Sequence, residues 1–303
     1  MMSTSNELAS ELLGLMTPLV AREGVTSTAL PAVSLFSFQQ QEERRPLIYE
    51  PCLIIVAQGR KVGYLGDRVI HYDPGQYLVQ TLPLPFECET HASDQAPLMA
   101  ISVGIDPALL SEMVTAMGAD PRLDAHRDPL PMASVAMTQG MHEAVVRLLR
   151  TLHDTRETAV MGILRVRDVI FEALKGDQGP ALRALVLGQG HYSRIVQVLS
   201  RLNTDFAAEH SVEALARQAN MSLSTFHQYF KQITRTSPVQ YLKRLRLIKA
   251  QQLLVQDACN VNQAAFAVGY RSVPQFSRDY KRCFGMSPLR HRRQWQEIDV
   301  AEV

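Results

Sequence analysis

The sequence predicts a multidomain protein in which an N-terminal β-barrel is followed by a helical connector and an all-α C-terminal part. Three observations lead to this prediction. Short β-rich runs recur from about residue 29 to residue 105, helical periodicity replaces them after residue 106, and a 50-residue repeat follows residue 190. The chain has 303 residues, 46% of them hydrophobic, which is enough apolar material for more than one packed core.

The N-terminal barrel is predicted from seven runs rich in β-branched and aromatic residues. Turn-forming pairs such as Gly66 with Asp67 and Pro74 with Gly75 separate them. Strands this short and evenly spaced are typical of a sandwich or a small barrel. The predicted strands lie at 32–38, 51–59, 61–66, 68–72, 75–81, 85–90 and 97–105. We assign residues 1–110 to this part, with the barrel itself starting near residue 28.

The connector is predicted at 111–190 from two apolar stripes with helical spacing. The two helices could pack on the barrel, on each other or across a dimer. The segment 175–190 is the best linker candidate, because its glycines and its proline interrupt a helix. The stripes consist of Met141, Val145, Leu148, Leu149 and Leu152, and of Val160, Ile163, Leu164, Ile170 and Leu174.

The C-terminal part, residues 191–303, contains two copies of one structural unit. Phe226, Phe230, Lys231, Ser237 and Pro238 recur 50 residues later as Phe276, Tyr280, Lys281, Ser287 and Pro288. In each copy a short helix ends at Asn220 or Gly269, and a second helix begins after a serine that suits the N-cap position, Ser222 or Ser272. A helix over 238–256 is predicted between the copies.

This order of elements is typical of the helix-turn-helix motif, whose second helix enters the major groove of DNA. We place the two motifs at about 212–233 and 261–284. On the exposed face of each second helix, Gln and Arg suit paired hydrogen bonds to bases, whereas Lys suits phosphate. The spacer helix would span roughly 28 Å, comparable with one DNA turn of about 34 Å, so both second helices could enter successive major grooves.

The charge distribution supports a nucleic-acid partner for this part only. The formal net charge is +1, but residues 191–303 hold 16 Lys and Arg against 8 Asp and Glu, while the preceding residues hold 15 against 22. A basic region beside an acidic one indicates that one of them meets a polyanion.

The composition also excludes several classes of protein. No apolar stretch approaches the roughly 20 residues of a membrane helix, and the N-terminus lacks a basic and apolar leader, so we expect a cytoplasmic protein without a membrane partner. The cysteines at 52, 88, 259 and 283 form no C-x-x-C pair, which argues against a zinc site or a disulfide framework. We expect no metal and no cofactor.

Residues 195–293 resemble the AraC/XylS family of bacterial transcription regulators. The similar stretches are LARQANMSLSTFHQYFKQ, SPVQYLKRLRLIKAQQLL and AVGYRSVPQFSRDYKRCFGMSPLRHRR. The resemblance implies base contacts from Ser224, His227, Gln228, Gln275, Ser277 and Arg278, and mostly phosphate contacts from Lys231, Ser272 and Lys281. The expected DNA-binding set also includes Ser222, Thr225 and Val273. Two residues depart from the family pattern, Arg235 in place of a glycine and Ala264 in place of a larger aliphatic residue.

The stretch LIYEPCLIIVAQGRKVGYLGDRVIHYDPGQYLVQTLPLP resembles the cupin-type barrel that precedes the DNA-binding part in one AraC subgroup. The resemblance implies a barrel that binds a small-molecule effector, mediates dimerisation, or does both. The partners expected from it are promoter DNA, RNA polymerase, an effector and a second copy of the chain. Candidate effector contacts, chosen because aromatic and amide side chains suit a barrel interior, are Tyr49, Cys52, Gln58, Tyr64, His71 and Tyr77.

Three alternatives stay open at this point. Cys52 is either a buried small hydrophobe or a sensor of electrophiles or oxidants. A cupin-type metal-dependent enzyme would need clustered ligands, whereas His71 and His91 are isolated and no H-x-H occurs, so we expect no catalytic residues and no enzyme activity. A non-specific architectural DNA binder would show affinity that depends on salt and barely on sequence.

Overall fold

The computed structural model describes residues 2–20, 22–118, 129–187, 190–256 and 259–293. The chain divides into two compact units. The first comprises Met1–Arg44, Tyr49–Leu82 and Cys88–Ser193, and the second comprises Arg45–Ile48, Pro83–Glu87 and Arg194–Val303.

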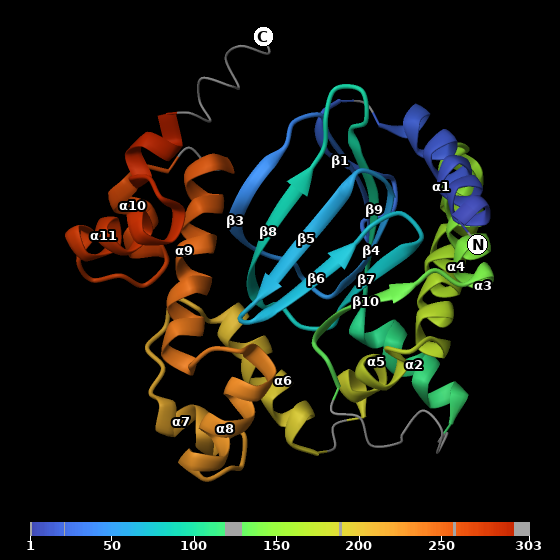
Figure 1. The fold of residues 1–303 in the computed structure, drawn as a ribbon. Helices are drawn as coiled ribbons and strands as arrows, with labels where there is room; N and C mark the ends of the chain where they lie inside the picture. The colour runs from blue at the N-terminus through green and yellow to red at the C-terminus, as the bar shows by residue number, and fades with distance from the viewer. Residues whose placement is uncertain (1, 21, 119–128, 188–189, 257–258, 294–303) are drawn as a thin grey trace. The chain divides into compact units, whose positions relative to one another are not determined.

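The strands form two sheets (Figure 1). All seven strands predicted from the sequence are present, with bounds that differ by at most two residues. The six-stranded sheet contains, in spatial order, β1 Gly24–Ser27, β2 Val33–Phe38, β9 Leu98–Gly104, β4 Cys52–Gln58, β7 Gln76–Gln80 and β10 Met132–Ala136. The four-stranded sheet contains β3 Glu42–Ile48, β8 Pro85–His91, β5 Arg60–Leu65 and β6 Arg68–Tyr72.

Three strands were not predicted: β1, β3 and β10. β3 reads EERRPLI, and its charges and proline are tolerated because it lies at the edge of its sheet. β10 corrects the prediction that residues 111–190 are helical throughout. It pairs with β7 in antiparallel register, with Val135 opposite Tyr77, so a non-local partner stabilises five residues that carry a weak local signal.

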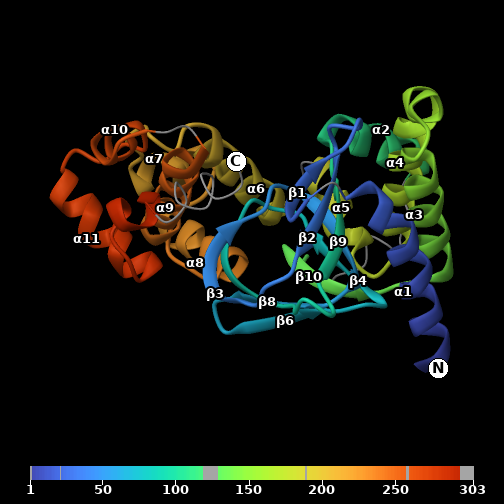
Figure 2. The ribbon, with the colours of Figure 1, turned by 90° about the horizontal axis from the view of Figure 1, so that it is seen from above.

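One face of the six-stranded sheet packs against helices. The register places Leu35, Ile101, Ile55, Tyr77 and Val135 in one row across five strands, and every member of that row is buried in the main apolar core. The same core takes side chains from helices that cover this face (Figure 2). The helices are α1 Met2–Met16, α2 Pro107–Met117, α3 Gln139–Leu152, α4 Thr155–Lys175 and α5 Gly179–Val186, with a short 3-10 turn, η1 Thr17–Leu19, after α1.

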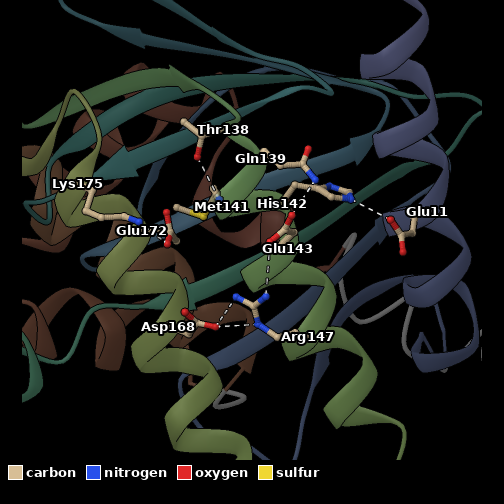
Figure 3. A network of polar contacts seen from close by, with 10 residues as sticks. All are labelled: Glu11, Thr138, Gln139, Met141, His142, Glu143, Arg147, Asp168, Glu172 and Lys175. Atoms are coloured by element: carbon tan, nitrogen blue, oxygen red, sulfur yellow. Dashed lines mark hydrogen bonds and ion pairs between the residues drawn. The ribbon is translucent and has the colours of Figure 1, made fainter.

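Polar contacts join α1, α3 and α4 above this core (Figure 3). The buried His142 ring lies 3.0 Å from Glu11, and the Arg147 guanidinium donates to the Asp168 carboxylate at 2.7 Å. Thr138 caps α3 by accepting a hydrogen bond from the Met141 amide. The first contact joins α1 to α3 and the second joins α3 to α4, so these two contacts stabilise the packing of the three helices.

The apolar stripe predicted for the second connector helix is divided in the structure. Ile170 and Leu174 are buried, but Val160, Ile163 and Leu164 are 72%, 59% and 50% exposed. The buried face of α4 instead contains small residues and the residues between the predicted ones, among them Thr158, Gly162, Val166 and Val169.

Within the linker predicted at 175–190, the described residues 179–186 form a helix instead. This helix is α5, which begins at Gly179 with Pro180 in its first turn, where the missing amide hydrogen costs no helical hydrogen bond. Ala181 and Leu182 are fully buried. A side chain on Gly179 would collide with the carbonyl of Leu174, so this glycine permits a tight turn between α4 and α5.

The C-terminal residues that supply most of the second unit form helices. The helices are α6 Gly190–Thr204, α7 Val212–Gln218, α8 Leu223–Thr234, α9 Pro238–Gln256, α10 Val261–Ala267 and α11 Val273–Phe284, followed by a helical segment at 288–293. The spacer helix α9 therefore has the bounds predicted from the sequence.

Candidate nucleic-acid interface

The first helix-turn-helix unit consists of α7, a tight turn and α8. Ser211 caps α7, and the turn passes through Asn220, which adopts a left-handed φ of 51°. Asparagine tolerates this conformation better than most residues. The Met221 amide then donates to the Ala216 carbonyl, which holds α8 at a defined angle to α7.

The second unit repeats this geometry with α10 and α11. Asn260 forms a reciprocal capping box with Gln263 at the start of α10, and Gly269 takes the left-handed turn position at φ 82°. A Cβ on Gly269 would collide with the Ala207 carbonyl, so glycine is required here for steric reasons as well. The Tyr270 amide donates to Ala265, matching the bond from Met221 to Ala216.

Each second helix buries an aromatic pair and exposes a polar face. Phe226 and Phe230 on α8, and Phe276 and Tyr280 on α11, are fully buried, with ring centroids 5.4 and 5.5 Å apart. The predicted DNA-contact residues lie on the opposite faces. Ser222, Ser224, His227, Gln228, Lys231, Gln275, Arg278 and Lys281 are exposed, and Thr225, Ser272, Val273 and Ser277 are half-buried.

The serines at the helix starts act as caps. The Ser222 hydroxyl accepts a hydrogen bond from the Thr225 amide, and it also contacts the Ser224 and Thr225 hydroxyls at 3.1 and 2.7 Å. Ser272 accepts from the Gln275 amide. Each helix thus presents its N-terminus, where backbone amides and the helix dipole favour an anion, beside its polar face.

Arg235 ends α8 in the left-handed conformation that the family pattern assigns to glycine. Its φ is 57°, and its amide donates to the Lys231 carbonyl. The equivalent residue after α11, Gly285, has a φ of 75° and donates to Lys281 in the same way. The departure from the family pattern therefore leaves the geometry of the cap unchanged.

The spacer helix α9 carries both units. Phe230 of α8 packs edge-on against Tyr241 near the start of α9, while Phe276 and Tyr280 of α11 pack with Leu247, Ala250 and Leu254 further along it. The two recognition helices therefore lie at different levels of one continuous helix, as the ribbon also shows (Figure 1).

Two basic residues of α9 have internal roles that sequence reasoning did not assign. The Lys243 ammonium lies 2.6 Å from the carboxylate of Asp279, a largely buried residue of α11. The Arg246 guanidinium donates to the Phe206 and Ala208 carbonyls at 2.7 and 2.8 Å, and burial lowers its pKa. Asp279 is the residue from which the role of Lys243 could have been inferred, because it is the one acidic residue between Val273 and Phe284.

The candidate effector residues do not all face the same region. Tyr77 belongs to the core between the six-stranded sheet and the helices, where burial raises its pKa to about 12. Tyr64 donates to Glu89 under the Arg44 guanidinium, and the exposed His71 lies on the same outer face of the four-stranded sheet. Gln58, at the end of β4, donates to the Pro97 carbonyl at 2.9 Å.

The remaining two candidates are Tyr49 and Cys52. Leu53 and Ile55 face the helices, so Cys52 lies on the opposite face of β4, toward the inside of the β part. A charge on Cys52 would raise the pKa of Tyr49. Burial raises the pKa of the Cys52 thiol to about 12, and a protonated thiol reacts poorly, which favours the small-hydrophobe interpretation.

Two properties of the described residues bear on the alternatives. They contain no group of three His, Cys, Asp or Glu side chains placed to hold a metal ion. No helix within the described ranges combines the length and the apolar character needed to cross a membrane.

Paired helix-turn-helix units with exposed polar second helices, preceded by a β part, define a DNA-binding regulator with an N-terminal β domain. The profile of the "AraC-type transcriptional regulator N-terminus" matches residues 29–181, half of the chain, and that of the "Helix-turn-helix domain" matches residues 215–294. The chain belongs to the AraC/XylS family of transcriptional regulators, which is a family of regulators and not of enzymes.

Curated relatives agree with this assignment, and a solved structure has the same fold. The "HTH-type transcriptional activator RhaS" of Salmonella heidelberg is 30% identical over 174 residues, which cover 56% of this chain and 61% of that protein. RhaS of Escherichia coli is 38% identical over 96 residues, 32% of this chain and 34% of its own. The chain thus spans less than two thirds of these relatives. The fatty-acid-bound ToxT from Vibrio cholerae shares the fold, with a TM-score of 0.62, 9% identity, and coverage of 89% and 97%.

Proposed function

We propose that this protein regulates transcription in the cytoplasm by binding specific promoter DNA through α8 and α11. The observation that carries the proposal is that both helices present exposed polar faces, on one spacer helix, in the part of the chain that holds the basic excess. The two faces differ, Ser224, His227 and Gln228 against Gln275, Ser277 and Arg278, so one protomer is expected to read an asymmetric site.

The roles of individual residues follow from their chemistry. Gln228, Gln275 and Arg278 suit paired hydrogen bonds to bases, and Ser224, His227 and Ser277 complete the base-facing set. Lys231, Lys281 and the capped helix starts at Ser222 and Ser272 suit phosphate, with Thr225 and Val273 beside them.

The proposed division of the chain assigns sensing to residues 1–110, connection and dimerisation to 111–190, and DNA binding to 191–303. Binding of a small-molecule effector in the β part changes the arrangement or availability of the DNA-binding units, and with it contact with RNA polymerase. We expect the net effect to be activation.

The second copy of the chain is expected to bind at the exposed stripe of α4. Val160, Ile163 and Leu164 lie at helical spacing and are each at least half exposed, which is unusual for contiguous apolar side chains on a monomer. An antiparallel pairing that sets Val160 opposite Leu164 of the partner subunit also brings Glu157 opposite Arg167 of the partner subunit. Opposite charges would thus flank an apolar centre.

The test is a binding-site selection with purified full-length protein, followed by affinity measurements on the selected site and on a scrambled duplex. Arg278→Ala should weaken binding to the selected site by about 1–3 kcal/mol and relax preference at one position. Lys231→Ala should weaken binding to both duplexes alike and reduce the salt dependence. Lys175→Ala is the control, because this lysine lies in the first unit, paired with Glu172.

A non-specific architectural binder would behave differently. It would select no sequence. Arg278→Ala would then weaken binding to the selected and the scrambled duplex alike, and so would Lys231→Ala. That outcome would replace the proposed function with the architectural one.

A further inference from the structure

A buried lysine faces the inside of the β part. In the register of β5 and β6, Lys61 is opposite Tyr72 and Val62 is opposite His71, and opposite residues share a face of the sheet. Lys61 and Tyr72 are 6% and 0% exposed, whereas His71 is exposed to solvent. The Lys61 side chain therefore points inward, away from the outer face where Tyr64 and His71 lie.

The contacts of the Lys61 ammonium are weak. Its nitrogen lies 3.4 Å from the Tyr49 hydroxyl, 4.0 Å from the Cys88 sulfur and 5.9 Å from the centre of the Phe38 ring. The Tyr72 hydroxyl lies 3.2 Å from the same sulfur, so the ammonium belongs to a small polar cluster. Among the described residues no carboxylate comes within ion-pair distance of this nitrogen, and Glu42 acts on it only through its charge.

A buried ammonium without a counter-anion is costly. The effective penalty for burying an ion is several kcal/mol, and it is offset when an opposite charge pairs closely with it. The second unit shows the usual arrangement, because the more exposed Lys243 has the Asp279 carboxylate at 2.6 Å. Lys61 is more deeply buried, and among the described residues its ammonium has a hydroxyl, a thiol and an aromatic ring as polar or aromatic neighbours.

The titration of the cluster agrees with this geometry. Burial disfavours the charged form of Lys61, but its interactions with neighbouring groups, among them the Glu42 carboxylate, leave its pKa above the usual value overall. Burial raises the pKa of Tyr49 and of Tyr72, so both phenols keep their protons at neutral pH. A protonated lysine thus lies beside two neutral hydroxyls that can donate.

We propose that the β part binds a small organic carboxylate at Lys61, with the Tyr49 and Tyr72 hydroxyls as further donors. The proposal rests on the proposed function, because it names the class of effector that the regulator senses. One ammonium and two hydroxyls match the single charge and two oxygens of a carboxylate, whereas a phosphate would bring a second negative charge.

The surroundings indicate how such a ligand would be accommodated. Gly63 follows Lys61 on the inward face of β5 and contributes no side chain there. Ile54, Val56 and Leu78 lie on the face of the six-stranded sheet turned away from the helices and would contact an apolar body. Tyr49 is half-buried as a residue, while its hydroxyl lies in the buried cluster.

The experiment measures ligand binding to the full-length protein by thermal shift and titration calorimetry. The probes are benzoate and the straight-chain carboxylates from acetate to decanoate, each paired with the alcohol of the same skeleton. At least one carboxylate should raise the melting temperature, and its alcohol should bind at least about tenfold more weakly, a loss of about 1.4 kcal/mol. This comparison of carboxylates with alcohols uses the wild-type protein alone.

Lys61→Met keeps the length of the side chain and removes its charge. We expect the active carboxylate to bind this variant at least about tenfold more weakly, and the ligand-free variant to melt no lower than the wild type. Lys175→Met, which removes an exposed lysine of the same unit, should bind the carboxylate as the wild type does.

The inference is overturned if no carboxylate in the series binds, if an alcohol binds equally well, or if Lys61→Met binds the carboxylate unchanged. DNA binding separates this failure from failure of the proposed function. If wild type and Lys61→Met both bind the selected site while no carboxylate binds, only the inference fails. If the wild type selects no DNA site, the proposed function fails whatever the ligand result.

Discussion

Arg235 shows how much a single residue can reveal before the structure is known. The sequence places it where the repeat and the family pattern favour glycine, and the structure has it in the left-handed conformation at φ 57°. For an L-residue with a side chain, this conformation costs roughly 1–2 kcal/mol. The strain was predictable because a cap depends on local backbone geometry, which the second copy of the repeat displays with Gly285.

Replacing this residue should therefore stabilise the helical unit. We expect Arg235→Gly to increase the free energy of unfolding by about 1 kcal/mol, measured by thermal and urea unfolding of the full-length protein. The matched control is Gly285→Ala, which should decrease it by a similar amount, because a Cβ there meets open space and only the backbone conformation is strained. A destabilised Arg235→Gly would show that the arginine side chain contributes more than its conformation costs.

Other residues could not be assigned a role from the sequence. Lys61 and Arg246 have the pattern of ordinary charged residues, and each acquires its role from partners elsewhere in the chain, Tyr49 and Phe206. By contrast, the exposed polar faces of α8 and α11 were predictable, because 3.6-residue periodicity separates them from the buried aromatic pairs.

At the scale of elements, α4 is the instructive case. Its helical periodicity was evident, but its apolar residues surround much of the helix, so the pattern alone did not identify the buried side. Packing selected Val166, Val169, Ile170 and Leu174 and exposed Val160, Ile163 and Leu164. Similarly, α5 begins at a glycine and a proline that are equally compatible with a linker.

The exposed stripe of α4 should determine the oligomeric state. Leu164→Glu is expected to weaken the dimer by at least about 100-fold, a loss of about 2.7 kcal/mol, because it places a charge in an apolar contact. Sedimentation velocity over a concentration series measures this. The control is Val69→Glu, at an equally exposed apolar residue on β6. A monomeric wild type, or a dimer that survives Leu164→Glu, would argue against dimerisation through α4.

At the scale of the DNA-binding unit, α9 sets the distance between the recognition helices. Nineteen residues of continuous helix link a unit packed near Tyr241 to one packed near Leu254, so the two contacts with DNA should have a fixed spacing of about one turn, 10–10.5 base pairs.

Inserting five base pairs between the two halves of the selected site should rotate one half to the opposite face of the duplex. We expect at least about tenfold weaker binding, from the loss of one or more paired base contacts of about 1–3 kcal/mol each. Gel-shift titration measures the change, and a substitution of five base pairs outside the contacted positions is the control. Unchanged affinity after the insertion would mean that α8 and α11 do not bind together.

The sequence by itself determined the class of fold, the seven central strands, the repeat, the spacer helix and the polar recognition faces. Each of these is set by local backbone preference or by a period of two or 3.6 residues, which is visible along the chain. Only the tertiary structure decided which side of α4 is buried, that β10 completes a sheet, and that Lys61, Tyr49, Tyr72 and Cys88 meet inside the β part. Those outcomes depend on strand register and on contacts between distant residues, for which the local sequence carries no signal.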